Sequence, residues 1–323
     1  MTYARSILVP PGSPGTYHCV SRCVRRAWLC GEDRESGRSY EHRRQWVEDR
    51  IGELAEIFAA AVWGYAVMSN HLHVVVEVMP QVAAGWSANE VAARWCRLYP
   101  RQDQDADSRT QVLAGNAERI EVLRARLGDL SWFMRRLAEP IARQANREDG
   151  CKGHFWEARF KCQALLDETA VLSVMAYVDL NPIRARICDT LDESLHTSAR
   201  ARLDAIEMDS IRSDQRLVPV LGIRGAHALA MSQREYLDLV DYTGRQIHPG
   251  KRGAITGPSP AVLARLGHSA DRWRRQVLAT NTGYCRAIGT VDMLVEKASE
   301  IEQKWLRGIS LARLLERQAA QLT

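Results

Sequence analysis

Apolar residues recur with two different periods in the first part of the chain. Over residues 41–62 they return every three or four positions with charged residues between them, which predicts an amphipathic helix. Residues 64–68 and 71–78 are apolar or β-branched runs, and Ser69-Asn70 between them has turn chemistry. A first strand is predicted over residues 17–24. This order of elements favours an α+β fold with an antiparallel sheet and helices packed on one face.

Helical patterns follow in the middle of the chain. Residues 130–146 predict one helix, and residues 167–180 predict another, with two acidic residues at its start, where the helix dipole favours negative charge. Pro182 is expected to limit the end of this second helix. Residues 81–130 are expected to form helices and a charged loop, over residues 101–110, as an insertion into the domain.

The last third of the chain has a helical pattern without a named motif. Residues 244–260, which are rich in Gly, Pro and basic side chains, predict a linker or a surface loop. We therefore expect a catalytic domain over residues 1–195 and a helical C-terminal region of unassigned role over residues 196–323.

Composition adds limits to this picture. The chain has 323 residues with 46% apolar side chains, which is enough for one large or two ordinary domains. A net charge of +5 permits a nucleic-acid partner without requiring one. No signal peptide or membrane-spanning run is evident, so we expect a cytoplasmic protein without a membrane partner. The eight cysteines are scattered, and the spacing of Cys19, Cys23, Cys30 and His18 is too irregular to favour zinc.

Candidate metal chemistry lies in the predicted strand over residues 71–78. Side chains alternate between the two faces of a strand, so His71 and His73 share one face with Val75 and Glu77. Two imidazoles at this spacing can hold one divalent metal. Paired histidines on a strand are also often only solvated, so this motif needs support from elsewhere in the chain.

That support comes from two later segments. Ser173, Tyr177 and Asn181 recur every four residues and lie on one face of the predicted helix. The segment over residues 154–161 is basic and aromatic, as in proteins that hold a nucleic-acid backbone and stack a base. It also fits an ordinary strand with a core Trp156.

Four segments in this order resemble the HUH single-tyrosine transposases of prokaryotic insertion sequences, and particularly their REP-associated branch. The resemblance covers about residues 10–195 and implies a ferredoxin-like α+β fold. It also implies cleavage and rejoining of single-stranded or hairpin DNA through a 5′-phosphotyrosine intermediate. The matching segments are Tyr17-His-x-x-x-Arg22, Tyr65-Ala-Val-Met-Ser-Asn-His-Leu-His, Trp156-Glu-x-Arg159-Phe160 and Tyr177-Val-x-x-Asn181-Pro182-Ile183-Arg184.

The resemblance assigns roles to individual residues. His71 and His73 are implied as ligands of Mg²⁺ or Mn²⁺, and Tyr177 is implied as the nucleophile. Asn181 stands where a third polar ligand is often found in the family. Two features depart from the family pattern, because Cys23 stands where glycine is common and the region over residues 81–130 is longer than in the minimal domain.

The partner that follows from these assignments is DNA, and the family allows both monomers and homodimers. Phosphate or base contacts are expected from cationic and aromatic side chains that flank the proposed site. These are Arg22, Arg135, Arg136, Arg143, Trp156, Arg159 and Lys161.

Two other functions are compatible with parts of the pattern. A metal-dependent hydrolase can use His71 and His73 while Tyr177 is only structural, although such enzymes usually need further ligands that cannot be assigned here. A non-catalytic DNA-binding regulator of the same fold is the other alternative. The intact set of two histidines and a tyrosine argues against it.

Overall fold

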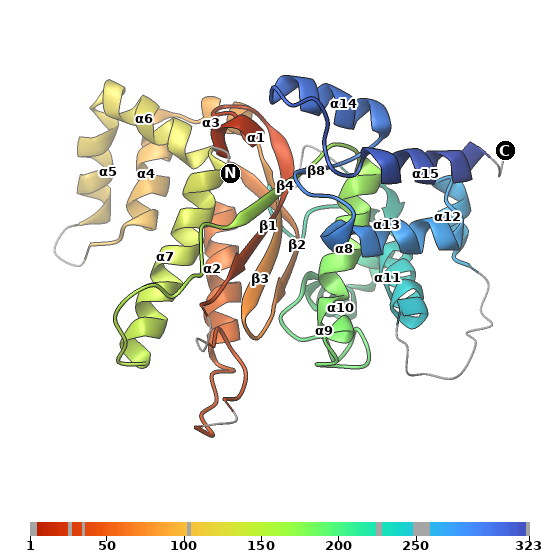
Figure 1. Cartoon of the computed structure of the whole chain (residues 1–323). Helices are drawn as coiled ribbons and strands as arrows, with labels where there is room; N and C mark the ends of the chain where they lie inside the picture. The colour runs from red at the N-terminus through yellow and green to blue at the C-terminus, as the bar shows by residue number, and fades with distance from the viewer. Residues whose placement is uncertain are drawn as a thin grey trace.

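A six-stranded sheet runs through the middle of the computed structural model, which describes residues 5–24, 28–33, 36–101, 105–223, 228–247 and 259–320 (Figure 1). The strand order is β6-β2-β3-β1-β4-β8. All neighbouring pairs are antiparallel except β4 and β8. The strands are β1 Gly15–Arg22, β2 Ala60–Val67, β3 His71–Val78, β4 Lys161–Leu165, β6 Leu221–Gly222 and β8 Ala287–Ile288.

The four inner strands and two helices form a ferredoxin-like unit. Helix α2 (Arg43–Ile57) connects β1 to β2, and α7 (Leu130–Glu148) precedes β4. The chain order β1-α2-β2-β3-α7-β4 combined with the spatial order β2-β3-β1-β4 is that of the split βαβ arrangement. Figure 1 shows α2 and α7 on the same face of the sheet. The predicted α+β fold with an antiparallel sheet and packed helices is therefore confirmed.

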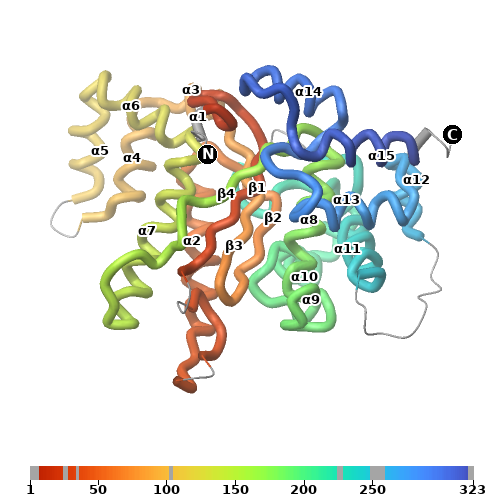
Figure 2. Tube along the Cα trace, in the orientation of Figure 1, coloured from red at the N-terminus to blue at the C-terminus, as the bar shows by residue number. Residues whose placement is uncertain are grey.

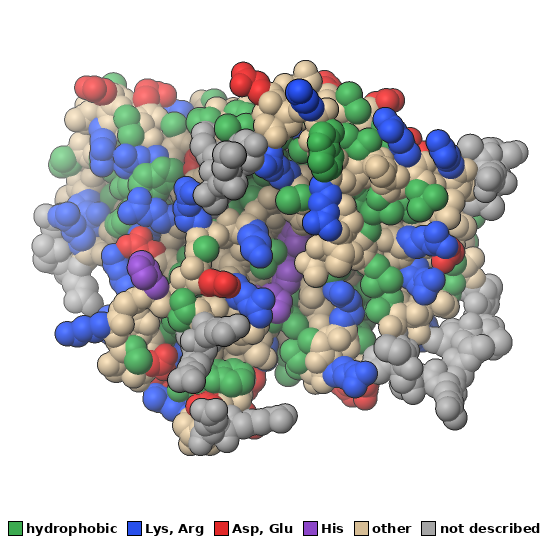
Figure 3. Space-filling view, in the orientation of Figure 1, with side chains coloured by type: hydrophobic (Ala, Val, Ile, Leu, Met, Phe, Trp, Pro, Cys, Tyr) green, Lys and Arg blue, Asp and Glu red, His purple; other side chains and the backbone are tan. Residues whose placement is uncertain are grey.

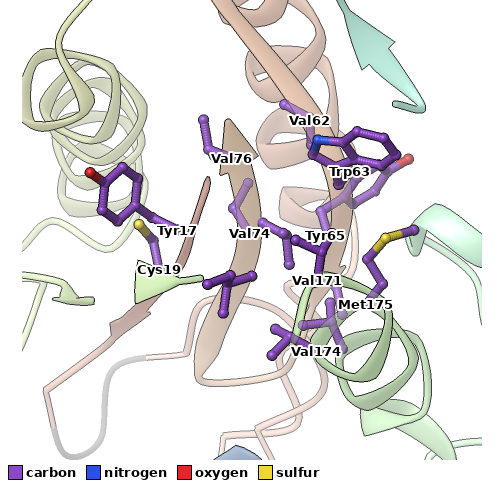
Figure 4. Packing of buried hydrophobic residues seen from close by; sticks show 14 of the residues in the cluster. Tyr17, Cys19, Val62, Trp63, Tyr65, Val74, Val76, Val171, Val174 and Met175 are labelled. Atoms are coloured by element: carbon purple, nitrogen blue, oxygen red, sulfur yellow. The ribbon is translucent and has the colours of Figure 1, made fainter. Parts of the chain in front are cut away.

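The opposite face of the sheet is covered by α8 (Glu168–Asp179) and by helices of the C-terminal region. Val171, Val174 and Met175 of α8 belong to the same buried cluster as side chains of β2 and β3 (Figure 4). Gly64 leaves room for the Ser198 hydroxyl, because a Cβ atom at this position would lie only 3.2 Å from Ser198 Oγ, whereas the Cα of Met175 in α8 would be at an ordinary contact distance of 3.8 Å. Burial on both faces explains why β2 and β3 are apolar nearly throughout.

Short helices form the layer beside α7, at the edge of the molecule away from the sheet (Figure 1). They fill most of the expected insertion. The predicted charged loop is helical from Ala106 onward, and residues 102–104 lie outside the described part of the chain. The helices are α3 Pro80–Ala84, α4 Ala88–Leu98, α5 Ala106–Ala114 and α6 Ala117–Leu127, and a short α1 (Arg5–Leu8) precedes β1.

The C-terminal region is mostly helical, as predicted, and Figure 2 shows its chain folding back beside α8. It also contributes β6 and β8, the two edge strands of the main sheet. The short α9 (Asn181–Arg184) directly follows α8. The elements of the C-terminal region are α10 Ser198–Met208, a 3₁₀ turn Ser210–Ser213, α11 Gln233–Ile247, α12 Ala261–Arg265, α13 Ala270–Thr282, α14 Val291–Glu300, α15 Ile309–Ala320 and the strand pair β5 Arg216–Leu217 with β7 Leu229–Ser232. None of the helices in the described residues is long and apolar enough to cross a membrane.

Several element boundaries differ from the sequence prediction, including those of β1, which was expected over residues 17–24, and of β2, which was expected over residues 64–68. The helix expected to reach Val62 ends at Ile57, because the apolar run that follows enters the buried sheet as β2. The predicted end of the helix over residues 167–180 is close to the observed one, since α8 ends at Asp179 and Pro182 lies in the first turn of the short α9 that follows. Gly244 of the expected loop lies inside α11, and residues 248–258 are outside the described part.

Candidate active site

Polar side chains from three adjacent strands meet on the face of the sheet that α8 covers. In the antiparallel register, Val20 of β1 pairs with His73 and Arg22 pairs with His71. His18 lies two residues before Val20, so it points to the same face and is diagonal to His73. On its other side, β1 pairs with β4, where Gln163 is directly opposite His18. The strand pairing alone therefore brings His71, His73, His18 and Gln163 to one place.

These side chains line a cavity of about 650 Å³. In Figure 3, histidine side chains lie in a hollow near the middle of the molecule, with Lys and Arg side chains around it. Tyr177 enters from α8, and its ring is edge-on to His73 with 5.8 Å between ring centroids. The rings of His71 and His73 are 4.9 Å apart, and Asn181 also lines this cavity. The structure thus brings together all four residues predicted for catalysis and metal binding.

Helix α8 is fixed in this position by a buried carboxylate two residues after Tyr177. Asp179 accepts hydrogen bonds from the Ser198 hydroxyl, from the Ala199 N–H at 2.9 Å and from the Tyr236 hydroxyl at 2.5 Å. Burial raises the pKa of Asp179 above its usual range, against the lowering effect of these donors. These partners belong to α10 and α11, so the C-terminal region holds the helix that carries Tyr177.

The Tyr177 side chain is buried but its hydroxyl is not engaged. Within the described part of the chain, this hydroxyl has no hydrogen-bond partner, whereas Tyr65 donates to Glu48 at 2.5 Å. The Arg184 guanidinium lies over the Tyr177 ring, with its central carbon 4.6 Å from the ring centroid. A tyrosine that lines a cavity beside a cationic side chain is suited to attack an anionic substrate.

The three histidines of the site are neutral at pH 7. Burial lowers the pKa of His18 to about 4, and burial together with the nearby Arg22 lowers the pKa of His71 to about 4. Burial also holds the pKa of His73 well below its usual range, with further lowering from His18, His71 and Arg184. A neutral imidazole keeps a lone pair on one ring nitrogen, which is the form that binds metals.

The side chains of the cavity supply some of the ligands that a divalent cation needs, but not a complete set. His71 Nδ1 is bonded to Asn70 Oδ1 at 2.7 Å, so its Nε2 is the nitrogen left for a metal. The Asn181 side chain donates through its amide nitrogen to the Tyr177 carbonyl at 3.0 Å, which leaves the amide oxygen. Among the described residues there is no group of three His, Cys, Asp or Glu side chains placed to hold one metal ion. Two imidazoles and one amide oxygen leave room for phosphate oxygens and water.

Cations predicted to bind DNA divide into two groups. Arg22, Arg159 and Lys161 line the cavity, and none of them has a carboxylate partner in the described part of the chain. Arg184 lines it too, although it was not among the predicted DNA-binding residues.

The other predicted DNA-binding residues do not line this cavity. Arg135, Arg136 and Arg143 lie on α7, on the opposite face of the sheet, and all three form ion pairs with Glu139. Trp156 is half-buried and its indole N–H donates to the Ala138 carbonyl at 2.9 Å. The structure therefore gives Trp156 the role of a packed side chain that joins the segment after α7 to α7 itself.

Sequence reasoning missed several residues of the cavity. His18 could have been predicted from the sequence, because it shares one face of the first strand with Arg22. Gln163 meets His18 only through the pairing of β1 with β4. Thr280, Tyr284 and Arg307 of the C-terminal region also line the cavity. No local pattern marks these three, since only the tertiary fold brings them beside the sheet.

No known protein-family model matches the chain, and no curated protein matches its sequence. Among solved structures, one that matches is a REP-associated tyrosine transposase bound to a REP hairpin. The match is 14% identical, covers 72% of this chain and 96% of that chain, and has a TM-score of 0.34. At this identity and TM-score the likeness assigns no activity, so we derive the function from the residues of the site.

Proposed function

We propose that this chain is a metal-dependent tyrosine transposase that cleaves and rejoins single-stranded DNA. The observation that carries the proposal is the unengaged Tyr177 hydroxyl in a cavity that also holds neutral His71 and His73. A tyrosine nucleophile, a candidate metal site and unpaired cations together suit attack on a phosphodiester.

The proposed reaction exchanges one phosphoester for another. The Tyr177 oxygen attacks the phosphorus and loses its proton to solvent, while the bond from phosphorus to the 3′ oxygen breaks. The departing 3′ oxygen takes up a proton, which leaves a 5′-phosphotyrosine and a free 3′-hydroxyl. Because the covalent link conserves the phosphoester, a 3′-hydroxyl of a second strand can reverse the step and join new ends. No oxidant or external energy source is required.

His71, His73 and the Asn181 oxygen would hold Mg²⁺ or Mn²⁺. When bound, the ion would supply positive charge at the scissile phosphate. Imidazole ligands favour Mn²⁺ over Mg²⁺ at this site, since Mg²⁺ prefers oxygen donors. Arg184 adds a protein charge beside Tyr177, which stabilises the negative charge that develops on the phosphate.

The arrangement of cations supports an unpaired DNA strand as the substrate. Arg22, Arg159 and Lys161 surround a cavity of about 650 Å³, which is the size of a small-molecule site and too small for a duplex. A flexible single strand can pass its backbone into such a space while these side chains contact its phosphates. Selection of the cleavage point by an adjacent hairpin is part of this proposal.

The test is covalent capture of DNA. The purified protein is incubated with a labelled pool of single-stranded hairpin oligonucleotides and Mg²⁺ or Mn²⁺, and adducts are resolved on denaturing gels. We expect a metal-dependent adduct that Tyr177→Phe abolishes without loss of hairpin binding. Strand cleavage without any adduct would instead indicate a hydrolase, and hairpin binding without cleavage would indicate a regulator.

A second tyrosine of the cavity gives a matched comparison. Burial raises the pKa of Tyr284 to about 12, and its hydroxyl donates to Gln276 Oε1 at 3.3 Å. Both features make Tyr284 a poor nucleophile. We therefore expect Tyr284→Phe to retain the adduct, and the opposite pattern in the two variants would move the nucleophile to Tyr284.

A further inference from the structure

A continuous row of hydrogen bonds links the C-terminal region to His73. The Gln163 amide nitrogen donates to the backbone carbonyl of Thr280 at 3.1 Å. Gln163 Oε1 lies 2.8 Å from His18 Nδ1, and His18 Nε2 lies 2.9 Å from His73 Nδ1. The planes of the two imidazole rings are 12° from parallel and their centroids are 5.1 Å apart, which fits a hydrogen bond directed along the ring planes. Every member of the row lines the cavity.

The chemistry of the first link determines the direction of all the others. A backbone carbonyl can only accept, so the Thr280 carbonyl requires the amide nitrogen of Gln163 on its side. The Gln163 oxygen then faces His18 and also can only accept, so the proton of neutral His18 must be on Nδ1. His18 Nε2 is thereby an acceptor, and His73 must donate to it from Nδ1. The remaining nitrogen of His73, Nε2, carries the lone pair.

We propose that Gln163 and His18 are positioning residues that hold His73 in the tautomer able to bind a metal through Nε2. This inference rests on the metal site proposed above. A free imidazole has no partner that fixes its tautomer. In this row the Thr280 carbonyl near the end of α13 orients the Gln163 amide, and the tautomers of His18 and His73 follow from that orientation. Ligating histidines in metal sites commonly donate their other N–H to a neighbouring acceptor, which orients the ring and raises its basicity. Here the acceptor is another histidine.

The proposal also gives the C-terminal region a part in the chemistry. Thr280 lies more than a hundred residues after Gln163 in the sequence, and α13 packs directly against α8. Helix α13 thus packs against α8, which carries Tyr177, and through Thr280 it also fixes the proton position on His73. A catalytic domain without this region would lack the carbonyl that orients the Gln163 amide.

The test compares the unmodified protein with the variants Gln163→Met and Gln276→Met. Methionine has a similar volume to glutamine, but its sulfur is only a weak acceptor. Gln276 is the control because it is a buried glutamine on α13 that is outside the row and does not itself line the cavity, although it accepts a hydrogen bond from the cavity residue Tyr284. The first measurement uses ¹⁵N-labelled histidine without metal or DNA, and two-bond ¹⁵N–¹H correlations report which nitrogen carries the proton. His73→Gln identifies the His73 signal.

We expect the proton of His73 on Nδ1 in the full-length protein and in Gln276→Met. In Gln163→Met we expect a shift toward the Nε2–H form of His73. Mn²⁺ affinity measured by calorimetry should then fall by about 10-fold in Gln163→Met, at the low end of the range for such supporting partners, and stay unchanged in Gln276→Met.

Three results would overturn the proposal. They are an Nε2–H tautomer of His73 in the unmodified protein, an unchanged tautomer in Gln163→Met, and a changed tautomer with unaltered Mn²⁺ affinity. Failure of the proposed transposase activity is a separate result, because it would appear as a missing DNA adduct while the tautomer measurements stay as expected.

Discussion

Two basic surfaces of this protein look alike in the sequence but differ in the structure. On α7, Arg135, Arg136 and Arg143 converge on the single carboxylate of Glu139. At the cavity on the other face of the sheet, Arg22, Arg159 and Lys161 have no carboxylate partner in the described part of the chain. Both sets were predicted to contact DNA, and only the second surrounds the proposed nucleophile.

The difference shows what decides whether a cation is available to a phosphate. Residues three or four apart on a helix face each other, so Glu139 is within reach of its arginines by helix geometry alone. Arg22 instead lies opposite a neutral histidine, His71, in the strand register, so strand pairing gives it no carboxylate. The cations at the cavity therefore have no carboxylate partner within the described residues that competes with an anionic ligand, whereas the three arginines of α7 share the carboxylate of Glu139.

Substitution of the cavity histidines is expected to have the largest effect on adduct formation, whereas substitution of a histidine on the α7 face is expected to have none. His71→Ala and His73→Ala should each reduce adduct formation by more than about 100-fold and weaken Mn²⁺ binding, since each removes a ligand from a site with few. Rates of adduct formation and Mn²⁺ titrations measure this. His42→Ala is the control, because His42 pairs with Glu148 at the end of α7 at 2.9 Å. Full activity in either cavity variant would remove the metal assignment.

A smaller effect is expected from arginine substitutions on the two faces. Each phosphate contact on a single strand contributes a slope of about −0.7 to the dependence of log affinity on log salt. Arg159→Ala should weaken hairpin binding and flatten this slope by about one contact, whereas Arg143→Ala should leave it unchanged. Salt titrations on one hairpin oligonucleotide compare the variants. The distinction between the faces fails if the two variants have the same slope.

The smallest effect on DNA binding should come from removing the carboxylate with which the α7 arginines pair. Glu139→Gln removes the shared carboxylate, and we expect a gain of about 0.5 kcal/mol or less in non-specific single-strand binding, because exposed ion pairs are weak. Adduct formation should not change. Binding to unstructured oligonucleotides at low salt measures the gain. A large increase in hairpin affinity would instead show that α7 belongs to the DNA-binding surface.

Much of the fold follows from residue periodicity. The alternation in β3 and the amphipathic spacing in α2 identified two elements of the ferredoxin-like unit, and residues 130–146 were correctly expected to be helical. Strand β4 was not predicted, and the ferredoxin-like arrangement was implied only by the family resemblance. The helix prediction extended too far at residues 58–62, because an apolar run buried on both faces has no period of its own. The end of α2 is set by tertiary burial of β2 and not by a local stop signal.

The candidate site was only partly readable from the sequence. His71 and His73 could be paired because one strand fixes their faces. Tyr177 and Asn181 could be paired by their four-residue spacing, although Tyr177 lies in α8 and Asn181 begins α9. The connection between these two pairs came from the family resemblance. His18, Gln163 and Thr280 are joined by strand register and by the packing of α13, and neither is encoded in a local pattern. Sequence reasoning consequently found the residues that we propose to react and missed the residues that contact them in the cavity.

The most direct test of a tyrosine transposase site is the identity of the residue that becomes attached to DNA. After reaction with a hairpin oligonucleotide and Mn²⁺, nuclease trimming and peptide mass spectrometry can locate the modified side chain. We predict a nucleotide linked through its 5′-phosphate to Tyr177 alone, absent when Mn²⁺ is withheld. A modification on Tyr284 or on another tyrosine, or strand cleavage with no modified peptide, would contradict the assignment of the cavity as a tyrosine transposase site.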